Sequence, residues 1–160
     1  MDTAASTKDI VVNAWKAFAT RDAAQIEAVF TEDAKWFAPP GNATGVALGY
    51  TDFVLDRPTI VRFLAKEFAT LFVSDVQVSF TSLVAEGSTA VLENHFQATL
   101  ANGRHYENDY CFVIQVKDGR IHRMREYMDT QRGARYLFGR DAGAAAEAGA
   151  AATRDAPQAA

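Results

Sequence analysis

The sequence of 160 residues contains one cysteine, Cys111, and three histidines, and both shortages exclude classes of protein. One thiol cannot form an intramolecular disulfide, so a small disulfide-stabilised fold is excluded. His95, His105 and His122 are widely separated and match no metal-ligand spacing. No glycine-rich phosphate loop follows a strand-like segment. We therefore expect neither a metal ion nor any other cofactor.

Long apolar runs and positive charge are also lacking. No apolar segment approaches the roughly 20 residues of a membrane span. The formal net charge of −4 is the wrong sign for binding a nucleic-acid backbone. The first residues are acidic, where a secretory signal would be basic and then apolar. These features predict a cytoplasmic protein without nucleic-acid or membrane partners, which acts on a small molecule or binds another copy of itself.

The composition is that of one globular domain, with 49% hydrophobic and 22% charged residues. We assign this domain to residues 1–140. Residues 141–160 are rich in alanine and contain no aromatic side chain. Such a segment buries little apolar surface, so we expect a disordered or weakly helical tail and assign it no function.

Three helices are expected in the first half of the chain. Ser6 and Asp9 have the spacing of a capping box, and Asp22 is a good N-cap for a shorter second helix. Asp56, followed by Pro58 in the first turn, begins the third helix. The apolar faces of these helices are Ile10, Val11, Ala14, Trp15 and Phe18, then Ile26, Val29 and Phe30, and finally Ile60, Val61, Phe63, Leu64, Phe68 and Leu71. Residues 36–50 between the second and third helices read as a long loop with short strands.

After Ser74 the apolar period changes from 3.6 to 2, which is typical of strands. Asn102-Gly103 and Asp118-Gly119 are strong signals for two-residue hairpin turns. The expected strands are 75–86, 89–100, 105–116 and 121–130. Helices followed by a meander predict an α+β fold, with the helices packed on one face of a curled sheet.

Two-residue turns at both sites would pair Asn94 with Cys111 and Cys111 with Glu126. One sheet face would then be largely apolar, and Asn94, Asp109 and Glu126 would lie within it. Its apolar members would be Leu92, Phe96, Cys111, Val113, Met124 and Met128. Buried polar groups must be paired, protonated or open to a pocket, so these three mark a candidate site. A single β-bulge would exchange the faces beyond it, and this alternative stays open.

The opposite face would be polar and aromatic, which is unusual for a solvated sheet surface. We therefore predict a homodimer interface on that face. The residues of this predicted interface are Tyr110, Phe112, Arg123, Arg125 and Tyr127.

Several short motifs occur in a characteristic order. They are Trp15-x-x-Phe18, Asp33-Ala34-x-Trp36, Asn102-Gly103-Arg104-x-Tyr106-x-Asn108-x-Tyr110, and Asp118-Gly119-Arg120-Ile121 followed by Arg125-Glu126-Tyr127-x-Asp129. In this order, over about residues 6–130, the chain resembles the SnoaL-like branch of the nuclear transport factor 2-like superfamily. The resemblance implies a cone-shaped α+β barrel, in which a curved antiparallel or mixed sheet wraps around three N-terminal helices and its open end is a ligand pocket. The superfamily includes ketosteroid isomerases, polyketide cyclases, epoxide hydrolases, dehydratases and non-catalytic modules. Glu126 corresponds in position to a catalytic carboxylate of polyketide cyclases and limonene epoxide hydrolases.

A carboxyl group in apolar surroundings has a raised pKa and can serve as a general acid or base. We expect Glu126 in that role, with Asp109 as its partner and Asn94 donating to a substrate oxygen. The predicted substrate-binding residues are Trp36, Tyr50, Phe96, Cys111, Met124 and Met128. The predicted protein is a cofactor-independent isomerase or lyase that isomerises, cyclises or dehydrates a hydrophobic oxygenated substrate. Two alternatives stay open: a non-catalytic ligand-binding or dimerisation module, and a Glu126 that faces solvent or pairs with an arginine.

Overall fold

The computed structural model describes residues 5–139, so the alanine-rich tail predicted at 141–160 lies outside the described residues. The helices are α1 (Thr7–Thr20), α2 (Ala23–Ala28), α3 (Ala43–Ala47), α4 (Arg57–Arg62), the π-helical segment η1 (Phe63–Glu67), α5 (Phe68–Leu71) and α6 (Thr130–Phe138). The strands are β1 (Phe30–Phe37), β2 (Val54–Asp56), β3 (Phe72–Glu86), β4 (Thr89–Leu100), β5 (His105–Lys117) and β6 (Arg120–Met128). Within the described part of the chain, none of the helices has the length and apolar character that crossing a membrane requires.

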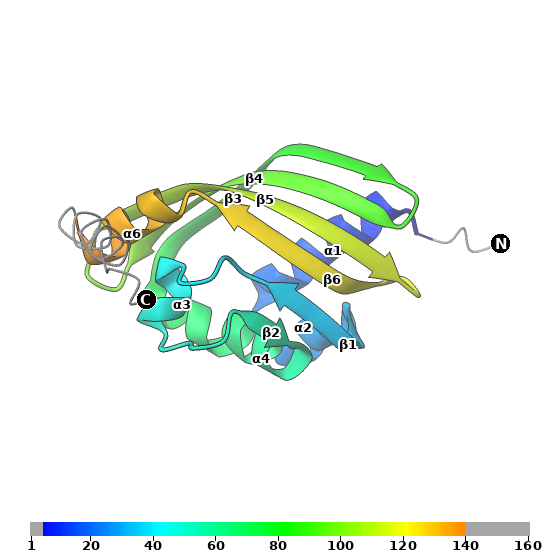
Figure 1. Ribbon diagram of the computed structural model, residues 1–160, viewed down its shortest axis with the longest axis horizontal. Helices are drawn as coiled ribbons and strands as arrows, with labels where there is room; N and C mark the ends of the chain where they lie inside the picture. Colours follow the sequence, from blue (N-terminus) through cyan, green and yellow to red (C-terminus); the bar gives the residue numbers. More distant parts are fainter. Residues whose placement is uncertain (1–4, 140–160) are drawn as a thin grey trace, which may run out of the picture.

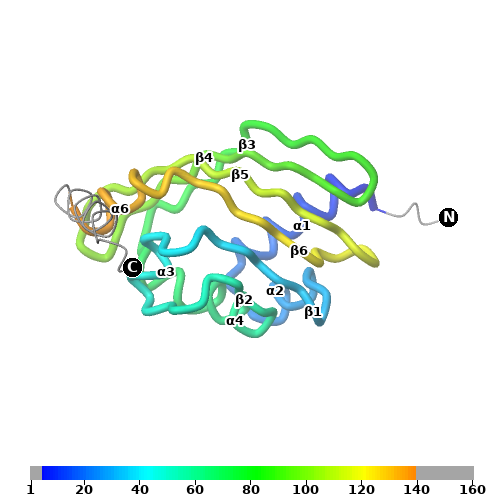
Figure 2. Tube along the Cα trace, viewed as in Figure 1, coloured from blue at the N-terminus to red at the C-terminus, as the bar shows by residue number. Residues whose placement is uncertain are grey.

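The six strands form one mixed sheet in the order β2-β1-β6-β5-β4-β3. Strand β1 runs parallel to β6, and the other neighbours are antiparallel. The sheet curls without closing, and α1, α2 and α4 lie on its inner side (Figure 1). The Cα trace in Figure 2 shows α6 at the end of the sheet opposite the first turn of α1. The expected α+β architecture with a curved, mixed sheet is confirmed.

The predicted helix starts are confirmed in detail. Ser6 and Asp9 form both bonds of a capping box at α1. The Asp22 carboxylate caps α2, and Asp56 caps α4 with proline in the first turn. The predicted third helix is interrupted, because Phe68 N–H bonds to the Phe63 carbonyl across the π-helical segment η1.

Strands β1 and β2 and helices α3 and α6 were not predicted. Phe30 was expected on the inner face of the second helix, but it begins strand β1, in which Phe30, Ala34 and Trp36 are buried. Helix α6 lies beyond the last expected strand, and Asp129 caps it by accepting from Arg132 N–H.

The predicted strand register is wrong by one residue at both hairpins. At the first, Leu100 N–H bonds to the Arg104 carbonyl at 2.8 Å, so three residues rather than two make the turn. Asn94 consequently pairs with Tyr110 instead of Cys111. At the second, the two-residue turn forms as predicted, but a β-bulge at His122 of β6, opposite residues 115 and 116, shifts the pairing beyond it.

Because of these two shifts, the side chains of β5 face the side of the sheet opposite to the one predicted. Those of β6 beyond the bulge face the predicted side. Glu126 now pairs with Phe112, and both face the concave side of the sheet. The inner residues of β5 are Tyr106, Asn108, Tyr110, Phe112 and Ile114. Asp109, Cys111 and Val113, which were predicted on the inner face, therefore lie on the outer one.

Candidate functional site

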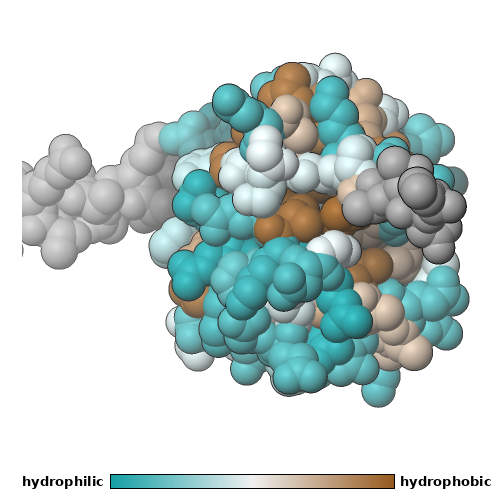
Figure 3. Space-filling view, turned by 90° about the vertical axis from the view of Figure 1, so that its right-hand side faces the viewer, coloured by the Kyte–Doolittle hydropathy of each residue, from teal (hydrophilic) through white to brown (hydrophobic). Residues whose placement is uncertain are grey.

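A cavity of about 670 Å³ lies between the concave face of the sheet and the helices α1, η1 and α5. Its wall is mostly apolar and rich in aromatic side chains, and the aromatic residues that line it are Trp15, Phe18, Trp36, Tyr50, Phe53, Phe63, Phe68, Phe72, Phe80, Phe96, Tyr110 and Phe112. The only charged residues lining it, within the described part of the chain, are Lys16, Arg21 and Glu126. Figure 3 shows hydrophobic side chains gathered in the middle of one face, surrounded by hydrophilic ones. An apolar cavity with a few polar groups is the usual form of a small-molecule site.

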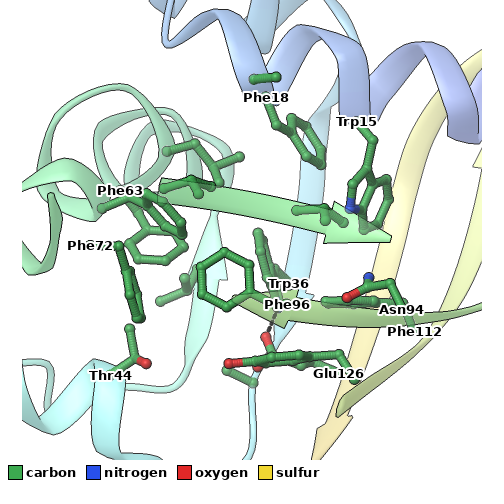
Figure 4. Close-up of a pocket in the computed structure, with 18 of the residues that line it drawn as sticks. Trp15, Phe18, Trp36, Thr44, Phe63, Phe72, Asn94, Phe96, Phe112 and Glu126 are labelled. Carbon is green, nitrogen blue, oxygen red and sulfur yellow. Dashed lines mark hydrogen bonds between the residues drawn. The ribbon is translucent and has the colours of Figure 1, made fainter. Parts of the chain in front are cut away.

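Glu126 is the carboxyl group of this cavity. It comes from β6, and its Oε2 accepts a hydrogen bond of 2.7 Å from Trp36 Nε1 of the neighbouring strand β1. Phe112 lies opposite it on β5, and Figure 4 shows Glu126, Trp36 and Phe112 close together. Burial raises the pKa of Glu126 to about 7, although the Trp36 hydrogen bond lowers it. At neutral pH the group is therefore populated in both forms and can accept or release a proton.

Two hydrogen-bonding side chains from the adjacent strands line the same cavity. Asn94 is buried, and its amide has no hydrogen-bond partner among the residues that the structure describes. Tyr110 shares a hydrogen bond of 2.8 Å with the Tyr106 hydroxyl. Burial raises the pKa of both tyrosines, and the Glu126 carboxylate raises the pKa of Tyr110 further. Both phenols therefore stay neutral, and a neutral hydroxyl can donate to an oxygen atom of a ligand.

Asp109 does not reach this site, so its predicted partnership with Glu126 has no structural basis. Its side chain is 68% exposed on the outer face of the sheet. It lies 2.6 Å from His95 Nδ1 and accepts a hydrogen bond of 3.2 Å from Arg132. The three-residue turn before β5 is the physical cause, because it turns the odd-numbered residues of that strand outward.

The predicted substrate-binding residues divide into two groups. Trp36, Tyr50 and Phe96 line the cavity. Cys111 lies on the outer face with Asp109, by the same change of register. The other two lie on β6 but do not line the cavity: Met124 is fully buried in the core, and the Met128 side chain approaches Gly133 of α6. These three residues are corrections to the predicted pocket.

Tyr50 already has hydrogen-bond partners at the cavity wall. Its hydroxyl donates to the Glu67 carboxylate, which also accepts a bond of 2.8 Å from Arg62. Burial raises the pKa of Tyr50 to about 12, and the Glu67 contact contributes. Tyr50 also packs edge-on against Phe63, so its ring forms part of the aromatic wall.

The predicted dimer face is also changed by the register. Tyr110 and Phe112 line the cavity, so they cannot belong to an outer interface. Arg123, Arg125 and Tyr127 do lie on the outer face, as expected, and all three are exposed. Dimerisation through this reduced set stays a prediction.

The cavity residues that were not predicted as site residues from the sequence include Lys16, Arg21, Tyr110 and Phe112. The two on β5 carried a usable signal. Along residues 105–114 the even positions are aromatic, amide or aliphatic, whereas charged groups occur only at odd positions. That alternation favours burying the even side, because burying unpaired charge is costly.

The sequence and the fold place the chain among known proteins. Residues 11–124 match the model of the SnoaL-like domain. The chain belongs to this family. The resemblance inferred from the sequence motifs is thus confirmed. A comparison with curated proteins found no matching sequence.

Solved structures share the fold at low sequence identity. An NTF2-like protein of unknown function from Burkholderia pseudomallei is 18% identical, with a TM-score of 0.70 over 84% of this chain and 99% of that one. TerC, co-crystallised with polyporic acid, is 19% identical, with a TM-score of 0.68 over 82% of this chain and 98% of that one. A hypothetical protein with a ketosteroid isomerase-like fold from Catenulispora acidiphila, in complex with trimethylamine, is 15% identical, with a TM-score of 0.63 over 82% of this chain and 94% of that one. At these identities the likeness shows the fold alone.

Proposed function

We propose that this protein is a cofactor-independent enzyme that moves a proton on a hydrophobic, oxygenated substrate, with Glu126 as the general acid and base. The observation that carries the proposal is a carboxyl group with a pKa of about 7, held by Trp36 in an aromatic cavity. A proton-transfer group is most effective when its pKa lies near the working pH. The SnoaL-like family, which includes polyketide cyclases and isomerases, is consistent with this chemistry.

The geometry supports the following steps. The ionised Glu126 removes a proton from a carbon next to a carbonyl group, and the electron pair moves onto the carbonyl oxygen. Asn94 Nδ2 or the Tyr110 hydroxyl donates a hydrogen bond to that oxygen as its negative charge grows. The protonated Glu126 then returns the proton to another carbon, which completes an isomerisation, or to a departing hydroxyl group, which completes a dehydration. Attack of the enolate carbon on a second carbonyl would give cyclisation.

Trp36 and Phe96 are proposed to bind the substrate through the faces and edges of their rings. Tyr50 is proposed to contact the substrate as part of the cavity wall. We also propose that the protein is located in the cytoplasm. Within the described residues, no group of three or more histidine, cysteine, aspartate or glutamate side chains is arranged to hold a metal ion.

Proton abstraction can be tested before the natural substrate is known. The probe is 2-tetralone in D₂O near neutral pH, and proton NMR follows the loss of the hydrogens next to its carbonyl. We expect the protein to accelerate this exchange and Glu126→Gln to lower the rate at least about 100-fold. Glu93→Gln is the matched control, because it removes a carboxylate from the exposed side of β4. Exchange that survives in Glu126→Gln would refute the assignment.

A second candidate is a ligand-binding module without catalysis. It is favoured by one observation: Glu126 is the only carboxyl group that lines the cavity in the described part of the chain. A protein that binds hydrophobic ketones tightly but does not accelerate their exchange would belong to this class.

A further inference from the structure

Arg21 occupies an unusual position at the end of α1. It adopts the left-handed conformation, with φ 59° and ψ 11°, and its backbone N–H bonds to the Phe18 carbonyl. This conformation suits glycine and is unfavourable for a residue with a Cβ atom. A glycine would end the helix at lower cost, so the side chain calls for a separate explanation.

The side chain is fixed on the wall of the cavity. Its guanidinium carbon lies 4.0 Å from the centre of the Phe68 ring, and its Nη1 donates to the Leu64 carbonyl at 3.2 Å. That carbonyl is available because of the π-helical segment: Phe68 N–H, its partner in a regular α-helix, bonds to the Phe63 carbonyl instead. The irregular turn thus provides both contacts that hold Arg21.

Most of the guanidinium remains unused. It has five N–H donors, and the structure pairs only Nη1. Among the described residues no carboxylate forms a salt bridge with it. Burial lowers the pKa of Arg21, since its charge is partly removed from water. A desolvated cation with unpaired donors in a cavity favours an anionic ligand.

The charge of the cavity wall also favours an anionic ligand. The chain as a whole carries a formal charge of −4, yet the cavity is lined by two cations, Lys16 and Arg21, and one carboxyl group. That carboxyl, Glu126, is only partly ionised at neutral pH. A row of aromatic rings extends between the Arg21 and Glu126 sides of the cavity. Phe68 packs on Phe96, and Phe96 packs on Tyr110.

We propose that Arg21 is an anion-binding residue and that the ligand of this cavity is a hydrophobic acid. Its apolar body lies along the aromatic row, and its carboxylate or equivalent anionic group pairs with Arg21. This inference rests on the proposed function, because it assumes that the same cavity holds the substrate. It adds the substrate class: an acid whose reacting carbon lies near Glu126 and whose charge is bound at the end of α1.

Two fluorescent probes with the same ring system test the inference. 1-Anilinonaphthalene-8-sulfonate is anionic, and N-phenyl-1-naphthylamine is its neutral counterpart. Fluorescence titrations at pH 7 compare the full chain with Arg21→Gly, Arg21→Lys and the control Arg120→Ala, which removes an exposed cation from the β5–β6 hairpin. Arg21→Gly suits the left-handed backbone, so its fold is expected to be retained, and thermal denaturation checks this.

We expect Arg21→Gly to weaken binding of the anionic probe about tenfold to a hundredfold, which is the range for a charge-assisted hydrogen bond. Binding of the neutral probe should change less than about threefold, Arg21→Lys should restore part of the loss, and Arg120→Ala should match the wild type. Equal weakening of both probes would show that Arg21 only supports the wall, and unchanged binding of the anionic probe would show that the anion binds elsewhere. Either result would overturn the inference. Glu126→Gln should retain this probe preference, so a failure of the proposed proton transfer is distinguishable from a failure of anion binding.

Discussion

Replacing Glu126 with glutamine should stabilise the protein in alkaline but not in acidic solution. Burial raises the pKa of Glu126 from its ordinary value of 4.5 to about 7. The folded state therefore binds this proton more tightly than the unfolded state does. Below pH 4.5 the group is protonated in both states and has little effect on the difference. As the pH rises through 7, the folded protein must hold a buried negative charge, and stability is lost.

The size of the effect follows from the two pKa values. Their difference, at about 1.4 kcal/mol per pH unit, corresponds to about 3 kcal/mol of unfolding free energy above pH 8. Glutamine removes the charge and can still accept the Trp36 hydrogen bond. Urea denaturation of the wild type and Glu126→Gln at pH 4, 6 and 8 measures the difference, with the exposed Glu93→Gln as control. Parallel stability curves for the wild type and Glu126→Gln would refute the buried-carboxyl account.

Three further changes test other parts of the structure. Trp36→Phe removes the N–H donor of Glu126, so the pKa of Glu126 should rise by about one pH unit or more in a carbon-13 NMR titration of the carboxyl groups; an unchanged pKa would contradict the bond. Gly45→Ala should destabilise the protein by about 1–3 kcal/mol in thermal denaturation, because its Cβ would lie 2.7 Å from Phe53 Cε1. Tyr127→Asp should convert the predicted homodimer into a monomer in light scattering, and a wild-type mass of 17.4 kDa would exclude that dimer.

Helix starts could be predicted from the sequence because their chemistry is local. The caps at Ser6, Asp22 and Asp56 each join a side chain to a backbone N–H three residues later. No distant part of the chain has to be known for such a contact. The same reason explains why the hairpin turns were placed correctly: Asn102-Gly103 and Asp118-Gly119 carry their own conformational preference.

Register could not be predicted in the same way, because one extra residue changes the face of every residue beyond it. The turn before β5 has three residues, and a bulge follows at His122 of β6. Each shifts the pairing by one, and the two shifts cancel at β6. Glu126 was therefore placed on the correct face although the pairing used to place it was wrong. Asp109, which lies between the two shifts, was placed on the wrong face.

The environment of Glu126 shows what local patterns leave out. Its hydrogen-bond donor, Trp36, lies 90 residues earlier, on a strand that pairs parallel to β6. Nothing in the turn signals of the meander indicates that pairing, and residues 36–50 were read as a loop. The pKa of Glu126 is thus set by contacts between distant segments, namely the burial that raises it and the Trp36 hydrogen bond that lowers it, whereas its position on a strand is not.

The cavity keeps its ionisable groups apart, and this separation has a chemical consequence. A negative charge next to Glu126 would raise its pKa further and would reduce the fraction that can act as a base at neutral pH. An acidic ligand bound by Arg21 would have its charge neutralised at the other end of the row formed by Phe68, Phe96 and Tyr110. Glu126 would then keep a pKa near 7 in the complex and could both remove and return a proton. The proposed anion binding and proton transfer would therefore be compatible in one cavity, because separate elements, the end of α1 and strand β6, would carry them.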